Sequence, residues 1–238
     1  MILRFAVLAT VFLASSLFLG AQIGPEEGEA PLAVPMPPPL LGKVDGSAYV
    51  AANGIYRVTV PVLPELGGQI TDDENVVTFE DAFNTHISIA SFPLNLEQKW
   101  ELDTRGLRDY LAYFFGNFVL GDFRQRFPGS SIESAKFITG LFDGSMLVYT
   151  LLPGGSFFEG RNSIMGAAAE PPVTAKRGNL CFVRSGSVFV ISTELAERAT
   201  QRHTYDLTTE KEDELLRQRL LGLAHNMEFA QPAATPGK

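Results

Sequence analysis

Two segments of the chain are apolar on both of the faces that a β-strand presents, and this feature constrains the fold most strongly. Residues 146–152 carry apolar side chains at almost every position, and residues 180–183 do the same. Because successive side chains of a strand point to opposite faces, such strands must be covered on both sides. We therefore expect an antiparallel sheet with helices on both faces.

Turn-forming dipeptides pair the expected strands as hairpins. Asn53-Gly54, Asp143-Gly144 and Ser185-Gly186 each separate two apolar or alternating segments, and such dipeptides readily adopt the positive φ angles of a tight hairpin turn. The expected strand pairs are residues 48–51 with 55–60, 76–80 with 86–92, 132–141 with 146–152, and 179–184 with 187–193.

Apolar side chains at helical spacing predict two helices. The first runs over about residues 105–126, with Thr104 as its N-cap and a Phe-rich face that includes Phe114. The second runs over about residues 210–227, where Thr209 and Glu212 have the spacing of a capping box. Hairpins followed by helices predict an α+β fold, with one antiparallel sheet in an α/β/α sandwich.

The first 21 residues have the composition of a signal peptide. Arg4 precedes an uncharged apolar run, and Gly20 and Ala21 are small, as cleavage after Ala21 requires. The interpretation places the protein outside the cytoplasm, in the periplasm or secreted. The alternative is an uncleaved segment over residues 5–21 that anchors the chain in a membrane.

The rest of the chain divides by composition into three parts. Residues 22–42 are rich in proline and acidic residues and are expected to form an extended linker. A single α+β globular domain is expected over residues 43–230. Residues 231–238 are expected to be a disordered tail.

Charge and cysteine content exclude some classes of protein. The net charge is −8, and Lys and Arg are scattered without forming a basic stripe, so we expect no nucleic-acid partner. The one cysteine, Cys181, cannot form an internal disulfide. It falls in an expected central strand, where a structural role is the more common one.

Motifs for catalysis or metal binding are not found in the sequence. There is no Gly-x-Ser-x-Gly turn, and none of the three histidines has a second one at helical spacing. The acidic run at residues 72–75 lacks the spaced ligands of a calcium loop and is expected to be a solvated turn. We therefore expect no catalytic residue, cofactor or metal site.

A long loop over residues 153–177 is the candidate binding element, because loops of this length are often functional. Adjacent glycine amides can hold an anion, and arginine can pair with a carboxylate or another planar anion. The alternative is an ordered surface loop that two Phe rings attach to the domain. The candidate residues are Gly154, Gly155, Phe157, Phe158, Arg161 and Arg177.

Taken together, several segments resemble the PsbP-like family, which includes photosystem accessory proteins, a eukaryotic Ran-interacting factor and bacterial surface lipoproteins. They are residues 54–58 leading to Pro61, the hairpin over residues 77–92, the Phe-rich helix, and residues 189–192 with the final helix. The resemblance covers most of residues 47–229. It implies an α/β/α sandwich and a non-enzymatic binding or assembly role. The lack of a cysteine near the cleavage site departs from the lipoprotein members.

These observations favour an exported, non-catalytic binding or assembly module of the bacterial cell envelope. Its partner would be an envelope protein or a small anionic ligand. Two alternatives stay open. One is a secreted hydrolase with a dispersed active site, and the other is a structural protein tethered to the membrane by its uncleaved N-terminal segment.

The signal-peptide interpretation makes the first prediction. Expressed in a bacterium, the chain is exported and begins at Gln22 or within a few residues of it, because the signal segment is removed. Mass spectrometry of the exported protein measures its first residue. A cytoplasmic chain that begins at Met1 contradicts the prediction, and an intact membrane-bound chain favours the tether.

Overall fold

The structure, a computed structural model, describes residues 39–159 and 172–230. From Leu40 onward the described residues belong to one compact unit. The predicted signal segment, nearly all of the predicted linker, Arg161 and the predicted tail lie outside the described residues. Within them, no helix combines the length and the hydropathy that crossing a bilayer requires.

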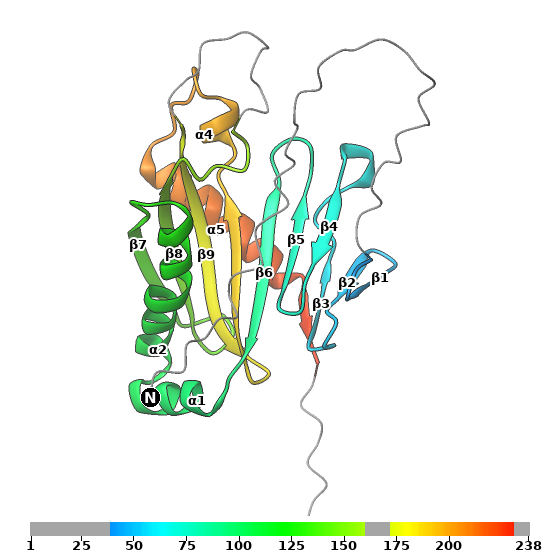
Figure 1. Ribbon diagram of the computed structural model, residues 1–238, viewed down its shortest axis with the longest axis vertical. Coiled ribbons are helices and arrows are strands. Elements are labelled where there is room, and N and C mark those ends of the chain that lie inside the picture. The colour runs from blue at the N-terminus through cyan, green and yellow to red at the C-terminus, as the bar shows by residue number, and fades with distance from the viewer. Residues whose placement is uncertain (1–38, 160–171, 231–238) are drawn as a thin grey trace, which may run out of the picture. The chain divides into compact units, whose positions relative to one another are not determined.

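Seven strands form one antiparallel sheet, and the expected hairpins build most of it (Figure 1). In spatial order the strands are β4 (Gln69–Asp72), β5 (Val76–Glu80), β6 (His86–Pro93), β10 (Ser187–Glu194), β9 (Thr174–Arg184), β8 (Ser145–Pro153) and β7 (Ser131–Ile138). Ser185 and Gly186 join β9 to β10 with φ angles of 48° and 74°, in the left-handed region that this tight turn requires. The edge strand β4 was not expected from the sequence.

A second sheet corrects the expectation that all hairpins share one sheet. Its strands, in order, are β1 (Lys43–Asp45), β2 (Ala48–Val50), β3 (Tyr56–Thr59) and β11 (Met227–Phe229). The hairpin β2–β3 pairs with β11, which places Met227 opposite Val58. Met227 was expected in the last helix. It lies in a strand because the helix ends at His225, and Met227 and Phe229 then alternate with Glu228.

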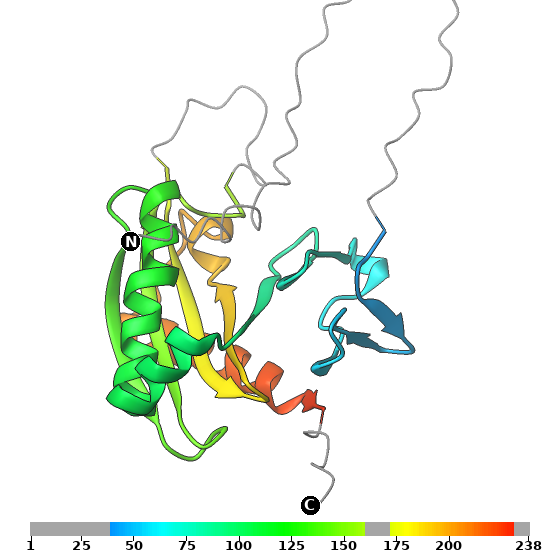
Figure 2. The ribbon, with the colours of Figure 1, turned by 60° about the horizontal axis from the view of Figure 1, so that its bottom comes forward.

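Helices cover both faces of the seven-stranded sheet, which confirms the predicted α+β fold (Figure 2). On one face lie α2 (Leu107–Phe114), the π-helical segment η2 (Phe115–Val119) and α3 (Leu120–Arg126). They form a core with Cys181 of β9 and Val190 of β10. On the other face lies α5 (Thr209–His225), whose Leu216 and Leu220 share a core with Leu180 of β9.

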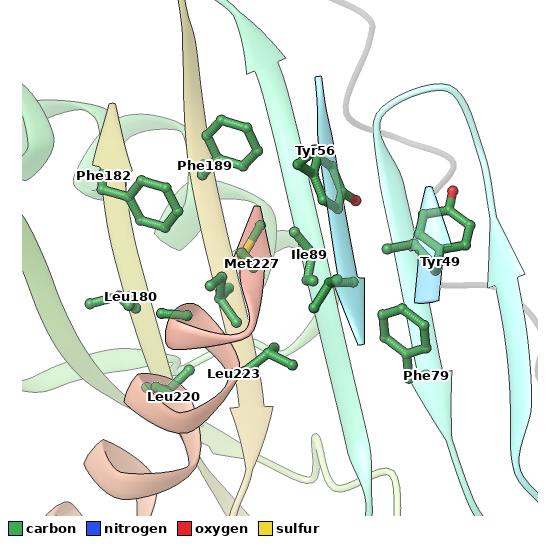
Figure 3. Close-up of a cluster of buried hydrophobic side chains, with 14 of the residues drawn as sticks. Tyr49, Tyr56, Phe79, Ile89, Leu180, Phe182, Phe189, Leu220, Leu223 and Met227 are labelled. Atoms are coloured by element: carbon green, nitrogen blue, oxygen red, sulfur yellow. The ribbon is translucent and has the colours of Figure 1, made fainter. Parts of the chain in front are cut away.

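Aromatic rings join the small sheet to the main one (Figure 3). Phe182 of β9 and Phe189 of β10 are stacked with ring centroids 5.1 Å apart. Tyr56 of β3 meets Phe189 edge-on at 5.7 Å. Because buried aromatic side chains remove large apolar areas from water, this cluster stabilises the contact between the two sheets.

The helix starts differ from the sequence expectation. Thr104 is not an N-cap, because it lies inside an additional helix, α1 (Leu96–Arg105), whose N-cap Asn95 accepts a 2.8 Å hydrogen bond from the Gln98 amide. Gly106, at φ 76°, separates α1 from α2. The cap of α5 is Thr208 rather than Thr209, and its side chain accepts from the Lys211 amide. A short helix, α4 (Glu197–Thr200), was also not expected.

Hydrogen bonds connect the residues just before Lys43 to the domain. The amides of Leu41 and Gly42 donate hydrogen bonds of 2.9 and 2.7 Å to the Asp72 carboxylate. The Tyr49 hydroxyl donates to the same carboxylate at 2.7 Å. The last two residues of the predicted linker are therefore attached to the domain.

The Phe-rich core makes the second prediction. Phe114 is buried and its ring lies 5.2 Å from Phe118 and 6.2 Å from Phe92, so Phe114→Ala lowers the free energy of unfolding by about 3–5 kcal/mol. Chemical denaturation measures the change. The control is Phe83→Ala at an exposed position, where the change stays within about 0.5 kcal/mol. A near-neutral Phe114→Ala contradicts the assigned core.

Candidate functional site

The structure brings five of the six candidate loop residues together, around a buried ion pair. Arg177 lies in β9 rather than in the loop, because β9 begins at Thr174. It is 3% exposed, and its Nε lies 3.5 Å from an oxygen of Glu194, which is 1% exposed. Arg161, the sixth candidate, lies outside the described residues.

The segment after β8 is held by this pair. A terminal nitrogen of Arg177 donates to the Gly155 carbonyl at 2.6 Å. The Ser156 hydroxyl and the Phe157 amide donate to the two oxygens of Glu194 at 2.5 and 3.1 Å. The Phe157 ring lies 4.0 Å from the guanidinium carbon of Arg177 and is stacked on His86 at 3.5 Å.

The two glycine amides already have acceptors. Gly154 donates to the Val173 carbonyl at 3.0 Å, and Gly155 donates to the Leu152 carbonyl at 3.1 Å. Phe158 is buried at 2% exposure. This arrangement favours a role for these residues in fixing the loop to the domain, which is the alternative that the sequence left open.

Burial dominates the electrostatics of the pair. It lowers the pKa of Arg177 to about 10, against the opposing effect of Glu194, and Arg177 therefore stays charged at neutral pH. Burial also raises the pKa of Glu194, although Arg177 and the Ser156 hydroxyl oppose that change. In both residues the pKa shifts in the direction that disfavours the charged form. The loss of hydration therefore outweighs the attraction between the two charges, as is common for buried ion pairs.

Lys176, the preceding residue of β9, is buried on the opposite face of the sheet. Its ammonium lies 2.5 Å from Glu133 of β7 and 3.0 and 2.5 Å from Glu212 and Asp213 of α5. Burial alone would lower the pKa of Lys176, but its hydrogen bonds with Asp213, Glu133 and Glu212 raise it. Lys176 therefore attaches α5 to the sheet, just as Arg177 attaches the loop.

Exposed apolar side chains gather elsewhere, on two turns at the edge of the sheet. Leu63 precedes the 3-10 helix η1 (Pro64–Leu66) and Leu66 ends it, with exposures of 58% and 42%, and Phe83 in the β5–β6 turn has 58%. We call Leu63, Leu66 and Phe83 the turn surface. The Ala82 amide donates to the Leu66 carbonyl at 3.2 Å, which joins the two turns.

Local sequence explains the hydrogen bonds that hold the two turns. Pro64 suits the first position of η1, and Gly67 ends it at φ 71° with its amide donating to the Pro64 carbonyl. In the other turn, one oxygen of Asp81 accepts from the amides of Phe83, Asn84 and Thr85 at 2.9–3.0 Å. Burial would raise the pKa of Asp81, but the hydrogen bonds from Thr85 and the other amides lower it.

A second exposed pair lies on α1. Leu96 is 86% exposed and Trp100 is 62% exposed, one helical turn apart. On the inner side of the helix, Gln98 accepts a 2.6 Å hydrogen bond from the Tyr110 hydroxyl, and Leu102 packs against the core. The charges exposed on this helix are of both signs, among them Glu97, Lys99 and Asp103.

Sequence reasoning missed both surfaces. Leu63 and Leu66 could have been found from their positions on either side of Pro64, directly before Gly67-Gly68, where a turn leaves apolar side chains without a strand partner. Phe83 falls inside an Asp-initiated turn, where polar residues are usual. Leu96 and Trp100 could have been predicted to lie on one face of a helix, because they are four residues apart and follow Asn95, a residue typical of an N-cap.

Comparisons with known proteins return solved structures at low identity. No protein-family model matches the chain, and no curated protein matches it. The Ran-binding protein Mog1p of Saccharomyces cerevisiae is similar over 80% of this chain and 96% of its own, with 10% identity and a TM-score of 0.45. The cyanobacterial PsbP (CyanoP) of Synechocystis sp. PCC 6803 is similar over 80% and 99%, with 14% identity and a TM-score of 0.46.

A third similar structure, from Bacteroides thetaiotaomicron, is matched over 80% of this chain but only 51% of its own, with 8% identity and a TM-score of 0.41. The similar structures thus include a PsbP protein, from the family whose resemblance the sequence indicated.

The buried pair makes the third prediction. Arg177→Met leaves the Glu194 carboxylate buried without its cation, so the free energy of unfolding falls by about 3–5 kcal/mol. Combining it with Glu194→Leu removes the unpaired charge, and the double variant is more stable than Arg177→Met alone. Denaturation of the three variants measures both effects. Wild-type stability for Arg177→Met contradicts the assigned structural role.

Proposed function

We propose that the chain is an exported, non-catalytic binding module that holds a protein partner against the turn surface. The observation that carries the proposal is the exposure of three large apolar side chains on turns that hydrogen bonds hold rigid. Exposed apolar patches are typical of interaction sites, and a rigid surface loses little conformational entropy when it binds.

The chemistry of the buried groups supports a non-catalytic role. Burial raises the pKa of the Cys181 thiol, which disfavours the thiolate that a nucleophile needs. Lys176, Arg177, Glu194 and Glu212 have perturbed pKa values, but each contacts oppositely charged partners from the domain itself. Their arrangement fits attachment of helices and loops to the sheet.

The exported location belongs to the proposal and rests on the first 21 residues. Their charged start, apolar run and small residues before Gln22 are typical of a secretory signal. An envelope protein is the partner that an exported module of this kind would meet.

The fourth prediction compares two variants, one with a photo-crosslinking residue at position 83 and one with it at position 96 of α1. In the native cells, position 83 gives a crosslinked protein of defined mass, and position 96 does not give it. The captured protein is then purified and its affinity is measured with Leu63→Ser/Phe83→Ser and with Leu96→Ser/Trp100→Ser. The first pair weakens binding at least about tenfold, because it removes apolar contact area.

The α1 pair is the matched control, because it also removes two exposed apolar side chains and leaves the turn surface intact. Wild-type affinity for Leu63→Ser/Phe83→Ser refutes the proposed site. Loss of affinity only in the α1 control moves the interface to that helix.

A further inference from the structure

The part of the chain that builds the turn surface has an unusual charge pattern. Residues 58–95 contain six Asp or Glu and no Lys or Arg. The segment includes η1, β4, β5, the β5–β6 turn and β6. The edge of the sheet that carries the turn surface is therefore built without a lysine or an arginine.

Three of these carboxylates are engaged with the backbone of the domain. Asp72 accepts from Leu41 and Gly42, Asp73 accepts from Asn75 and Val76, and Asp81 accepts from the amides of its own turn. These bonds orient the carboxylates inward and use them to fix turns.

Two others are placed differently. Glu65 lies in η1 between Leu63 and Leu66, and Glu80 ends β5 directly before the Asp81 turn that carries Phe83. Glu65 is exposed and Glu80 is partly exposed, and neither forms an ion pair within the described part of the chain. Each of the two joined turns thus offers apolar surface together with a carboxylate that has no cationic partner there.

We propose that the turn surface binds a cationic segment of a partner polypeptide. Apolar side chains of that segment contact Leu63, Leu66 and Phe83, and its Lys or Arg side chains pair with Glu65 and Glu80. The inference rests on the proposed function and adds the chemistry of the partner.

Charge complementarity selects this occupant over others. Nucleic acids and anionic membranes are repelled by the carboxylates of the segment. A second copy that presents the same surface is repelled for the same reason. Charged groups at the rim of an interface mainly raise the association rate and the specificity. Salt screens their attraction, with a Debye length of about 8 Å at physiological ionic strength, and binding of the cationic segment therefore weakens as salt is added.

The test uses the mature full chain and short synthetic peptides in which lysine and leucine alternate. Two control peptides are used. One alternates glutamate with leucine and reverses the charge, and the other alternates lysine with serine and removes the apolar side chains. Titration calorimetry at low and physiological salt measures the affinity. The lysine–leucine peptide binds the wild type more tightly than either of the other peptides does.

Two charge variants are compared. Glu65→Lys/Glu80→Lys weakens binding of the lysine–leucine peptide at least about tenfold and removes most of its salt dependence. Glu97→Lys/Asp103→Lys, on α1, makes the same change in net charge at exposed positions and alters the affinity by less than about twofold. Thermal melting verifies that both variants are folded.

Each outcome decides the matter. Equal loss in the α1 control shows general attraction to an acidic protein and overturns the inference, as does a wild type that fails to bind the peptide. The inference is also overturned if the chain binds phosphatidylcholine vesicles more tightly than it binds the lysine–leucine peptide, or if it self-associates. The captured native partner separates the two proposals. If Leu63→Ser/Phe83→Ser abolishes its binding, but neither salt nor Glu65→Lys/Glu80→Lys changes its affinity, the proposed function stands and only the cationic character of the partner is refuted.

Discussion

The contact between β9 and α5 is the constraint on which the rest of the domain depends. A Cβ atom at position 178 of β9 would lie 2.9 Å from Leu220 Cδ1 and 3.0 Å from Leu216 Cβ, so Gly178 leaves the room that the helix needs to pack this closely. On the opposite face, Cys181 of the same strand packs under the α2–α3 helices. From Ala175 to Phe182, β9 is therefore buried on both faces, and the neighbouring elements pack around it.

Two adjacent cations at the start of β9 extend this constraint to its surroundings. Lys176 attaches α5 and β7 on one face, and Arg177 attaches the segment after β8 on the other. Buried charges of this kind contribute little net stability, because burial costs hydration, but an unpaired partner costs several kcal/mol. They specify one arrangement of the loop and the helix, and their charges are used within the domain. The proposed binding site therefore uses groups that remain exposed.

The sequence predicts the parts of the fold that depend on local pattern. Hairpin turns such as Ser185-Gly186 and the two-faced apolar strands led to the main sheet and to helices on both faces. Short strands such as β11 were missed, because three residues carry almost no periodicity and form a strand only by pairing with β3. The sequence places Arg177 in a loop, because its ion pair with Glu194 joins two strands and leaves no local pattern.

Hydrogen–deuterium exchange of the mature chain, alone and with its purified partner, tests most directly that binding occurs on preformed turns. In the free protein, the amides of Asn84 and Thr85 are already protected, because Asp81 accepts them and tertiary packing holds the turn. Adding the partner slows exchange further in residues 63–67 and 80–85 and leaves residues 96–105 of α1 unchanged. Protection confined to α1, or to the segment after β8, would contradict the account.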